Sequence, residues 1–336
     1  MKHLFILMLS ALSLINPPMQ QECVVGVLDV SGVDTGGVAK EISVQEARQK
    51  SVPVVIPDKA FKAYCLSVID VSRTGGRIMS DQMAALERIS VSDRGIMSLQ
   101  GIEYCTGLKT LICMNNNIEE LDLQYNEALE MLICSGNRLS ELDVSANTAL
   151  HYMDCGKNAL EVLDVQHNEH LTLLICADNE LEELDVSDNS ALEYLDCSNN
   201  WLTNLDVTQN RNLVILNCGG NELTELDVTR NEKLLMLCCA NNKLMELDVS
   251  GNTSLQNLNC QGNKLLWLDI SENKDLLQLQ CGSNLLRGLR LNTIGLHQSQ
   301  FLDCANNPYL KELWLKVAQD TTFHKKDAHT TYRWKE

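Results

Sequence analysis

The sequence is dominated by a 21-residue unit that runs eight times without a gap from Leu108 to Asp275. Its pattern is L-x-x-L-x-C-x-x-N-x-L-x-x-L-D-V-S-x-N-x-x, and we number its positions 1 to 21 from the first leucine. A fixed period of this length predicts a solenoid, in which each unit forms one turn and buries its apolar side chains against its neighbours.

The leucine spacing is typical of leucine-rich repeats. Positions 4 and 6 alternate inward from a short strand, and successive strands then pair in parallel about 4.8 Å apart. We therefore predict an α/β-type leucine-rich repeat solenoid, or horseshoe. It has a parallel sheet on its concave face, an irregular convex face and a small helical N-terminal cap.

Cysteine stands at position 6 of every regular unit, where the strand turns it inward. Reduced cysteine packs as a small apolar residue, so we interpret this row as a structural ladder. Two alternatives stay open: a disulfide series, which has no preferred pairing among equivalent neighbours, and a metal site, which a straight row of thiolates encloses poorly. The ladder comprises Cys113, Cys134, Cys155, Cys176, Cys197, Cys218, Cys239, Cys260, Cys281 and Cys304.

Two polar positions also repeat. Asparagine at position 9 is expected to turn the chain off the strand, with its amide bonding backbone groups or the stacked amides of neighbouring units. Aspartate at position 15 lies between two inward apolar residues, so it is expected to face solvent on the convex side and to bond backbone amides of the following turn. A metal-binding row is the alternative. These aspartates are Asp122, Asp143, Asp164, Asp185, Asp206, Asp227, Asp248 and Asp269.

Positions 3 and 5 point out of the sheet and form the concave face. Apolar and aromatic residues at position 3 give way to amides toward the C-terminus. Exposed apolar stripes that include tyrosine mark protein interaction surfaces, although exposed strands also favour large residues in general. Cys238, also at position 5, is expected to be an exposed thiol. The candidate partner-binding residues are Met131, Tyr152, Asp154, Leu173, Tyr194, Asp196, Ile215 and Met236.

The N-terminus has the features of an export signal. Lys2 precedes an apolar run from Leu4 to Ile15, which is too short to span a bilayer. Lipidation of Cys23 is an alternative, although the residues before it are not those of a lipobox. The predicted segments are a signal peptide (1–20), a leader or linker (21–55), a helical cap (56–85), about eleven repeats (86–315) and a C-terminal cap or tail (316–336).

The cap is expected to contain two helices. One starts after Asp58, and a second opens at Ser80-Asp81 and continues to Glu87. Between them, the loop from Asp70 to Asp81 resembles the start of an EF-hand, but aspartate stands where glutamate closes a good calcium site. Calcium binding at this loop and a disulfide between Cys65 and Cys105 stay open.

Composition excludes several functions. A net charge of -18 argues against nucleic acid as a partner and favours a basic one. No second apolar stretch predicts membrane insertion of the mature chain. His151, His167, His170 and His297 lie within repeats and form no catalytic pattern, so we expect neither an enzyme, a cofactor nor a metal site.

The unit resembles the repeats of internalin J and related bacterial surface proteins, where cysteine also stands at the sixth position before a Leu-Asp-Val-Ser-x-Asn run. It is also similar to secreted or surface leucine-rich repeat proteins of Bacteroidetes, including the run Ile102-Glu103-Tyr104. The resemblance implies an adhesin-like protein whose horseshoe binds host or bacterial macromolecules. We therefore expect an exported, monomeric, non-catalytic protein that recognises a protein on a host or bacterial surface. The alternative is a scaffold that binds a glycan or small ligand.

Overall fold

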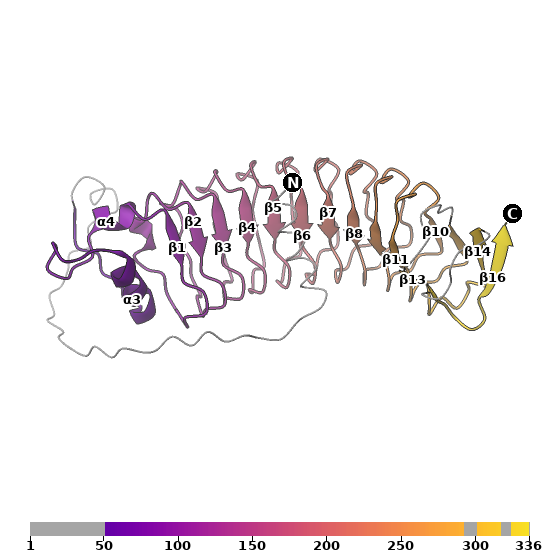
Figure 1. The fold of residues 1–336 in the computed structure, drawn as a ribbon, viewed down its shortest axis with the longest axis horizontal. Helices are drawn as coiled ribbons and strands as arrows, with labels where there is room; N and C mark the ends of the chain where they lie inside the picture. The colour runs from indigo at the N-terminus through magenta and orange to yellow at the C-terminus, as the bar shows by residue number, and fades with distance from the viewer. Residues whose placement is uncertain (1–50, 292–300, 317–323, 336) are drawn as a thin grey trace. The chain divides into compact units, whose positions relative to one another are not determined.

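The structure is a computed structural model that describes residues 51–291, 301–316 and 324–335. The predicted signal peptide, residues 21–50 of the predicted leader and Cys23 lie outside the described residues. Figure 1 shows the described repeats side by side, one strand to a turn, following the helices of the cap. The chain thus forms the leucine-rich repeat solenoid that the repeat period predicts.

A single parallel sheet of twelve strands contains one strand from nearly every unit. Its strands have three residues each, except the last, which has two. Each strand pairs with the same positions of the next unit, so Leu132 lies opposite Met153, and Leu174 opposite Leu195. A slip of one residue would turn these apolar side chains to solvent, which fixes the register. The strands are β1 (Arg88–Ser90), β2 (Thr110–Ile112), β3 (Met131–Ile133), β4 (Tyr152–Asp154), β5 (Leu173–Ile175), β6 (Tyr194–Asp196), β7 (Ile215–Asn217), β8 (Met236–Cys238), β9 (Asn257–Asn259), β11 (Gln278–Gln280), β13 (Phe301–Asp303) and β15 (His324–Lys325).

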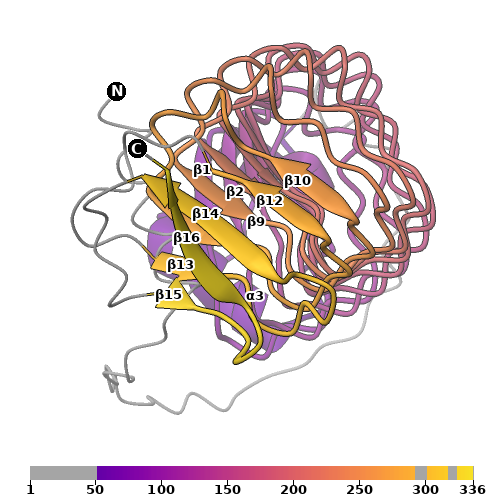
Figure 2. The same ribbon diagram turned by 90° about the vertical axis from the view of Figure 1, so that its right-hand side faces the viewer.

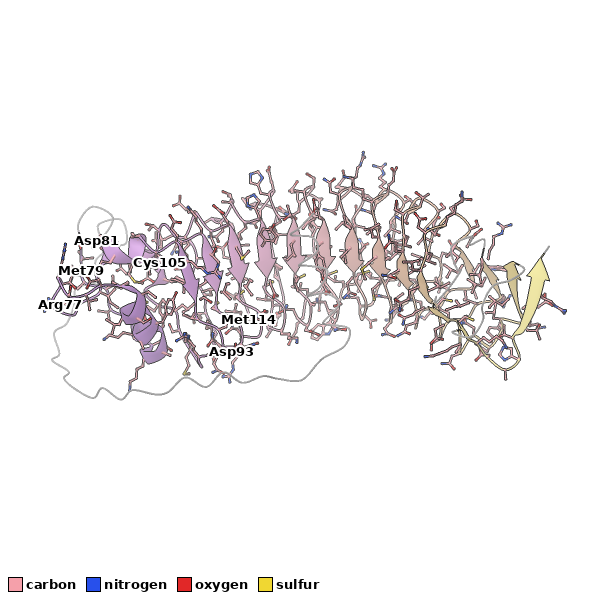
Figure 3. All side chains as sticks on the ribbon, in the orientation of Figure 1. Arg77, Met79, Asp81, Asp93, Cys105 and Met114 are labelled. Atoms are coloured by element: carbon pink, nitrogen blue, oxygen red, sulfur yellow. The ribbon has the colours of Figure 1, made fainter. Side chains whose placement is uncertain are left out.

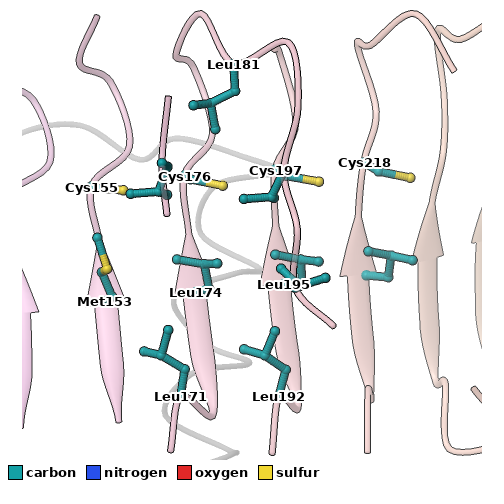
Figure 4. Packing of buried hydrophobic residues seen from close by; sticks show 14 of the residues in the cluster. Met153, Cys155, Leu171, Leu174, Cys176, Leu181, Leu192, Leu195, Cys197 and Cys218 are labelled. Carbon is teal, nitrogen blue, oxygen red and sulfur yellow. The ribbon is translucent and has the colours of Figure 1, made fainter. Parts of the chain in front are cut away.

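Leucine, cysteine and valine of the repeat fill the interior. In one unit, Leu171, Leu174, Cys176 and Leu181 are all fully buried. Figure 4 shows their counterparts in the neighbouring units at the same heights, layer on layer. Burying one such leucine contributes about 1.5–3 kcal/mol. A single turn has no partner for this apolar face, so its stability depends on the turns beside it.

Asparagine at position 9 joins consecutive units. The Nδ2 of Asn137 donates to the carbonyls of Cys113 (3.0 Å) and Cys134 (2.8 Å), and its Oδ1 accepts the N–H of Ile118 at 3.1 Å. The prediction that these amides bond backbone groups is confirmed. The alternative, that stacked amides bond one another, is wrong. The amide groups at position 9 bond backbone groups instead, at the point where the chain leaves the strand.

Asparagine at position 19 forms a second ladder, whose role the sequence analysis missed. The Nδ2 of Asn168 donates to the carbonyls of Val144 (3.1 Å) and Asn147 (3.0 Å), which both lie in the preceding turn. Its recurrence in register was the signal that could have revealed it. Within the described residues, the buried Oδ1 atoms of this ladder accept no hydrogen bond: those of Asn126, Asn147, Asn168, Asn189, Asn210, Asn231, Asn252 and Asn273.

The N-terminal cap contains helix α3 (Lys59–Val68) and helix α4 (Ser80–Ala84), and the short 3-10 helix η1 (Ile102–Tyr104) follows β1 in the first repeat. Asp58 caps α3 as predicted, since its carboxylate accepts the N–H groups of Ala60 and Phe61. The second helix is shorter than predicted and ends before Glu87, because the chain turns there to enter β1.

The last described residues of the predicted leader contact the cap. The N–H of Val54 donates to the carbonyl of Ile78, and the N–H of Ser80 donates to the carbonyl of Val52, both at 2.8 Å. Figure 3 labels Arg77, Met79 and Asp81 in this part of the cap. Residues 52–54 therefore belong structurally with the helices that follow them.

At the C-terminal end, strands β10 (Trp267–Asp269) and β12 (Gly288–Arg290) form one small parallel sheet, and β14 (Glu312–Lys316) and β16 (Thr331–Lys335) form another. Figure 2, which looks along the stack, shows these strands in front of the earlier turns. The carboxylate of Asp327 accepts the N–H groups of Asn306 (2.8 Å) and Asn307 (2.7 Å). Together with β15, this contact makes the tail a further turn that covers the last repeat.

Candidate functional site

The concave face carries the candidate partner-binding residues on six consecutive strands, β3 to β8. Met131, Tyr152, Asp154 and Met236 are partly exposed. The expectation of a fully exposed stripe is wrong at its centre, where Leu173, Ile215 and Tyr194 are only 5%, 6% and 7% exposed. Neighbouring strands lie about 4.8 Å apart, so large side chains in adjacent turns cover one another.

Two carboxylates lie within this apolar surface. Asp154 accepts hydrogen bonds from the Ser135 hydroxyl (2.8 Å) and the Gly156 N–H (3.1 Å). Asp196 is 8% exposed, and its Oδ1 accepts from the N–H (3.0 Å) and hydroxyl (2.6 Å) of Ser198. Burial raises the pKa of both carboxyls above its ordinary value, although the hydrogen bonds oppose the shift. Both are acids that the surrounding apolar surface destabilises in their charged form.

These raised pKa values predict how the fold responds to pH. The folded state binds protons more tightly than the unfolded state, so the carboxyls contribute stability below the ordinary aspartate pKa and lose it as the pH rises through their folded pKa. The double variant Asp154→Asn/Asp196→Asn keeps an acceptor oxygen without the charge. Its free energy of unfolding, measured in urea, is expected to exceed that of the wild type by about 0.5–2 kcal/mol at neutral pH. This gain in stability should disappear near pH 3.

The matched control is Asp164→Asn/Asp206→Asn, which removes two charges from the same repeats at position 15. It is not expected to gain stability at neutral pH, because its two carboxylates are exposed. A loss of stability at neutral pH in Asp154→Asn/Asp196→Asn would contradict the assignment of these carboxyls as destabilised groups.

The thiol of Cys238 was expected to be exposed, but it is half-buried, and burial raises its pKa. On its strand it lies opposite Asn217 of β7 and Asn259 of β9. This end of the concave face is therefore lined by amides and one weakly acidic thiol, which gives it a different chemistry from the tyrosine-containing centre.

The ladder cysteines lie behind this face, inside the solenoid. All of them are buried free thiols, and Figure 4 shows the sulfurs of Cys155, Cys176, Cys197 and Cys218 aligned in one row. Burial raises the pKa of each thiol, to about 12 for Cys113. A neutral buried thiol packs as an apolar side chain, so their placement matches that of the leucines around them.

This ladder also relates the chain to a solved structure. The functional domain of InlJ from Listeria monocytogenes, described as including a cysteine ladder, is 32% identical to this chain with a TM-score of 0.62. The match covers 82% of this chain and 70% of that one. The chain belongs to the cysteine-ladder leucine-rich repeat family of InlJ. No protein-family model and no curated protein matches the sequence.

More distant structures share the fold alone. A leucine-rich repeat protein of Leptospira interrogans is 24% identical with a TM-score of 0.58, over 62% of this chain and 57% of that one. The ectodomain of the receptor kinase GASSHO1/SCHENGEN3 from Arabidopsis thaliana is 18% identical with a TM-score of 0.57, over 76% of this chain and 37% of that one. The InlJ family thus uses an architecture found in proteins of very different origin.

A thiol titration tests whether the ladder of this family member is a packing element. In the native protein without reductant, the ladder thiols are expected to resist a thiol-reactive dye, because they are buried and their pKa values are raised. After denaturation, all ten should react. If most of the ladder stays unreactive in denaturant until a reductant is added, it is a disulfide series and the packing interpretation fails.

The convex aspartates form the hydrogen bonds that we predicted. In each of the eight, Oδ1 accepts the backbone N–H of the residue two positions later. The N–H of Ser145 donates to Asp143, and the N–H of Ser187 donates to Asp185, both at 2.9 Å. The hydrogen bonds from Ser187 lower the pKa of Asp185. The charges at position 15 thus stabilise the turn that follows them.

The EF-hand-like loop has its oxygens engaged locally. Asp70 accepts the N–H of Ser72 at 2.9 Å, and the carboxylate of Asp81 accepts the hydroxyl of Ser51. Among the described residues, no group of three or more His, Cys, Asp or Glu side chains is arranged to hold a metal ion. Cys65 and Cys105, between which a disulfide was an open alternative, are both buried free thiols.

Three of the repeat histidines lie within the described residues, and His297 lies outside them. The rings of His151 and His170 stack with centroids 5.8 Å apart. His167 and His170 line a surface pocket together with Glu169 and Asp188.

No helix among the described residues is long and apolar enough to cross a membrane.

Proposed function

We propose that this chain is a non-catalytic, monomeric binding protein that uses the concave face from β3 to β8 to recognise a protein on a host or bacterial surface. The observation that carries the proposal is the stripe at position 3, which is continuous over the six parallel strands β3 to β8 and has the carboxylates of Asp154 and Asp196 beside it at position 5. The stripe consists of Met131, Tyr152, Leu173, Tyr194, Ile215 and Met236. Apolar surface that includes tyrosine favours protein partners.

Three further features support this function. The fold, shared with InlJ, presents a broad open sheet that suits a protein better than a small molecule. A plant ectodomain with the same architecture is described in complex with CASPARIAN STRIP INTEGRITY FACTOR 2. The apolar run after Lys2 is that of a signal peptide, so we propose that the protein is exported.

The test is a pull-down from host-cell and bacterial-surface extracts, with the wild-type chain and Tyr152→Ala/Tyr194→Ala as baits. We expect a protein partner that the wild type retains and the folded double variant loses. A glycan array is probed in parallel. Equal retention by both baits would overturn the concave face as the binding site, and binding to glycans alone would replace the protein partner with a sugar.

A further inference from the structure

The centre of the concave face contains a compact group of six side chains from three strands. In one row, Asp154 of β4, Ile175 of β5 and Asp196 of β6 lie in register, and in the other Tyr152, Leu173 and Tyr194 do. Strands are about 4.8 Å apart, so the two aspartates are roughly 10 Å apart at their Cα atoms. Two carboxylates thus lie on either side of an apolar floor, with two tyrosines beside them.

Among the residues that the structure describes, these carboxylates lack an ion pair of the kind that the chain provides elsewhere, although the charge of Lys157 also acts on Asp154 and lowers its pKa. Asp303, which also occupies position 5 of the concave face, has Lys325 of the next strand 3.7 Å from its carboxylate. Within the described residues, neither Asp154 nor Asp196 forms an ion pair, although both are more buried than most aspartates. Burying a carboxylate is costly, and the hydrogen bonds from Ser135 and Ser198 offset only part of this cost, so an external positive group would stabilise both carboxylates further.

Tyr194 belongs to the same group of side chains. The side chain is only 7% exposed, yet no hydrogen bond to its hydroxyl occurs within the part of the chain that the structure describes. Tyr194 lies on β6 with Asp196, two strands from Asp154, and both carboxylates raise the pKa of its hydroxyl in addition to the larger effect of burial. The hydroxyl is not among the fully enclosed polar atoms without a partner, so it is open to donate to a ligand group that covers this part of the concave face.

We infer that the concave face receives an arginine side chain of the protein partner, held between Asp154 and Asp196 over Ile175 and beside the two tyrosines. This inference rests on the proposed function and names the partner's chemistry. A guanidinium has five N–H donors directed outward in one plane, so it can donate to carboxylates on both sides. Its faces stack on apolar and aromatic side chains. The net charge of -18 favours a basic partner in the same direction.

Panning a phage-displayed library of random peptides on the full-length chain tests the inference. Wild-type protein is expected to select peptides enriched in arginine. Asp154→Asn/Asp196→Asn is expected to bind the selected peptides roughly 30-fold more weakly or worse. The control Asp164→Asn/Asp206→Asn changes the net charge equally and should bind them as the wild type does. Replacing the selected arginine by citrulline, which is neutral and similar in shape, should also abolish binding.

Other outcomes separate this inference from the proposed function. The selected peptides could instead lack arginine, compete with the natural partner and fail to bind Leu173→Arg. This result would support the concave face as the binding site and overturn the arginine site. Arginine-rich peptides that bind Asp154→Asn/Asp196→Asn as well as the wild type would overturn it too, as binding by general charge. If the selected peptides bind Leu173→Arg as tightly as the wild type, both the arginine site and the concave face as the binding site are contradicted.

Discussion

Replacing Asn200 by leucine is expected to lower the free energy of unfolding by about 2–6 kcal/mol. The buried N–H of Leu181 is left without a partner, at about 1–3 kcal/mol. Two further hydrogen bonds, to carbonyls that each keep one other asparagine donor, are lost at about 0.5–1.5 kcal/mol each. Asn200 is 3% exposed. Its Nδ2 donates to the carbonyls of Cys176 and Cys197, both at 3.0 Å, and its Oδ1 accepts the N–H of Leu181 at 3.1 Å. Leucine is similar in size, so the loss reports hydrogen bonding rather than a cavity.

Urea denaturation followed by circular dichroism measures this loss. Because two of the three bonds join Asn200 to the preceding unit, the variant should also unfold less cooperatively, with the transition splitting near this repeat. The control is Asn212→Leu, on the surface, where the Nδ2 donates to the carbonyl of Ser190. It should cost less than about 1 kcal/mol. Equal losses in the two variants would show that the position 9 ladder does not join the units.

Replacing Leu173 by arginine is expected to weaken binding of the partner about 30-fold or more, the effect of losing an interaction hot spot. Leu173 lies at the centre of the stripe on β5, between Tyr152 and Tyr194. An arginine there reaches solvent without disturbing the core, so the fold should be retained. It places a cation beside Asp154 and Asp196, where it occupies the acidic site and repels a basic partner.

Surface plasmon resonance with the partner recovered by pull-down measures this effect. The control is Val162→Arg, which adds the same charge to the position equivalent to Trp267 of β10, outside the main sheet. Val162 is 73% exposed, so the substitution is not expected to affect folding or binding. A similar loss in both variants would indicate general electrostatics and would contradict a role for the concave face.

The repeat period made most of the fold predictable. Leucine and cysteine at fixed spacing leave one way to bury every apolar side chain, so the strand register and the burial of the ladder follow from the sequence alone. Aspartate at position 15 also behaves as predicted, because an Asx-type bond to the N–H two residues later depends only on the local chain.

The remaining features depend on contacts between units or on residues outside the repeat. The low exposure of Tyr194 and Asp196 arises from neighbours 21 residues away on each side, which a single unit does not reveal. Asn168 bonds carbonyls 24 and 21 residues earlier, so its role becomes visible only when turns are stacked. The tail has no period, yet Lys325 pairs with Asp303 as a further strand.

Site-specific photocrosslinking tests the central claim most directly, namely that the concave face contacts a protein partner. A benzophenone amino acid is placed at Tyr152 on the concave face, or at Val162 in the same unit but outside the main sheet. Each protein is then irradiated with the extract that yields the partner. Cross-linking from Tyr152 but not from Val162 is the predicted result. Cross-linking from Val162 alone would contradict it.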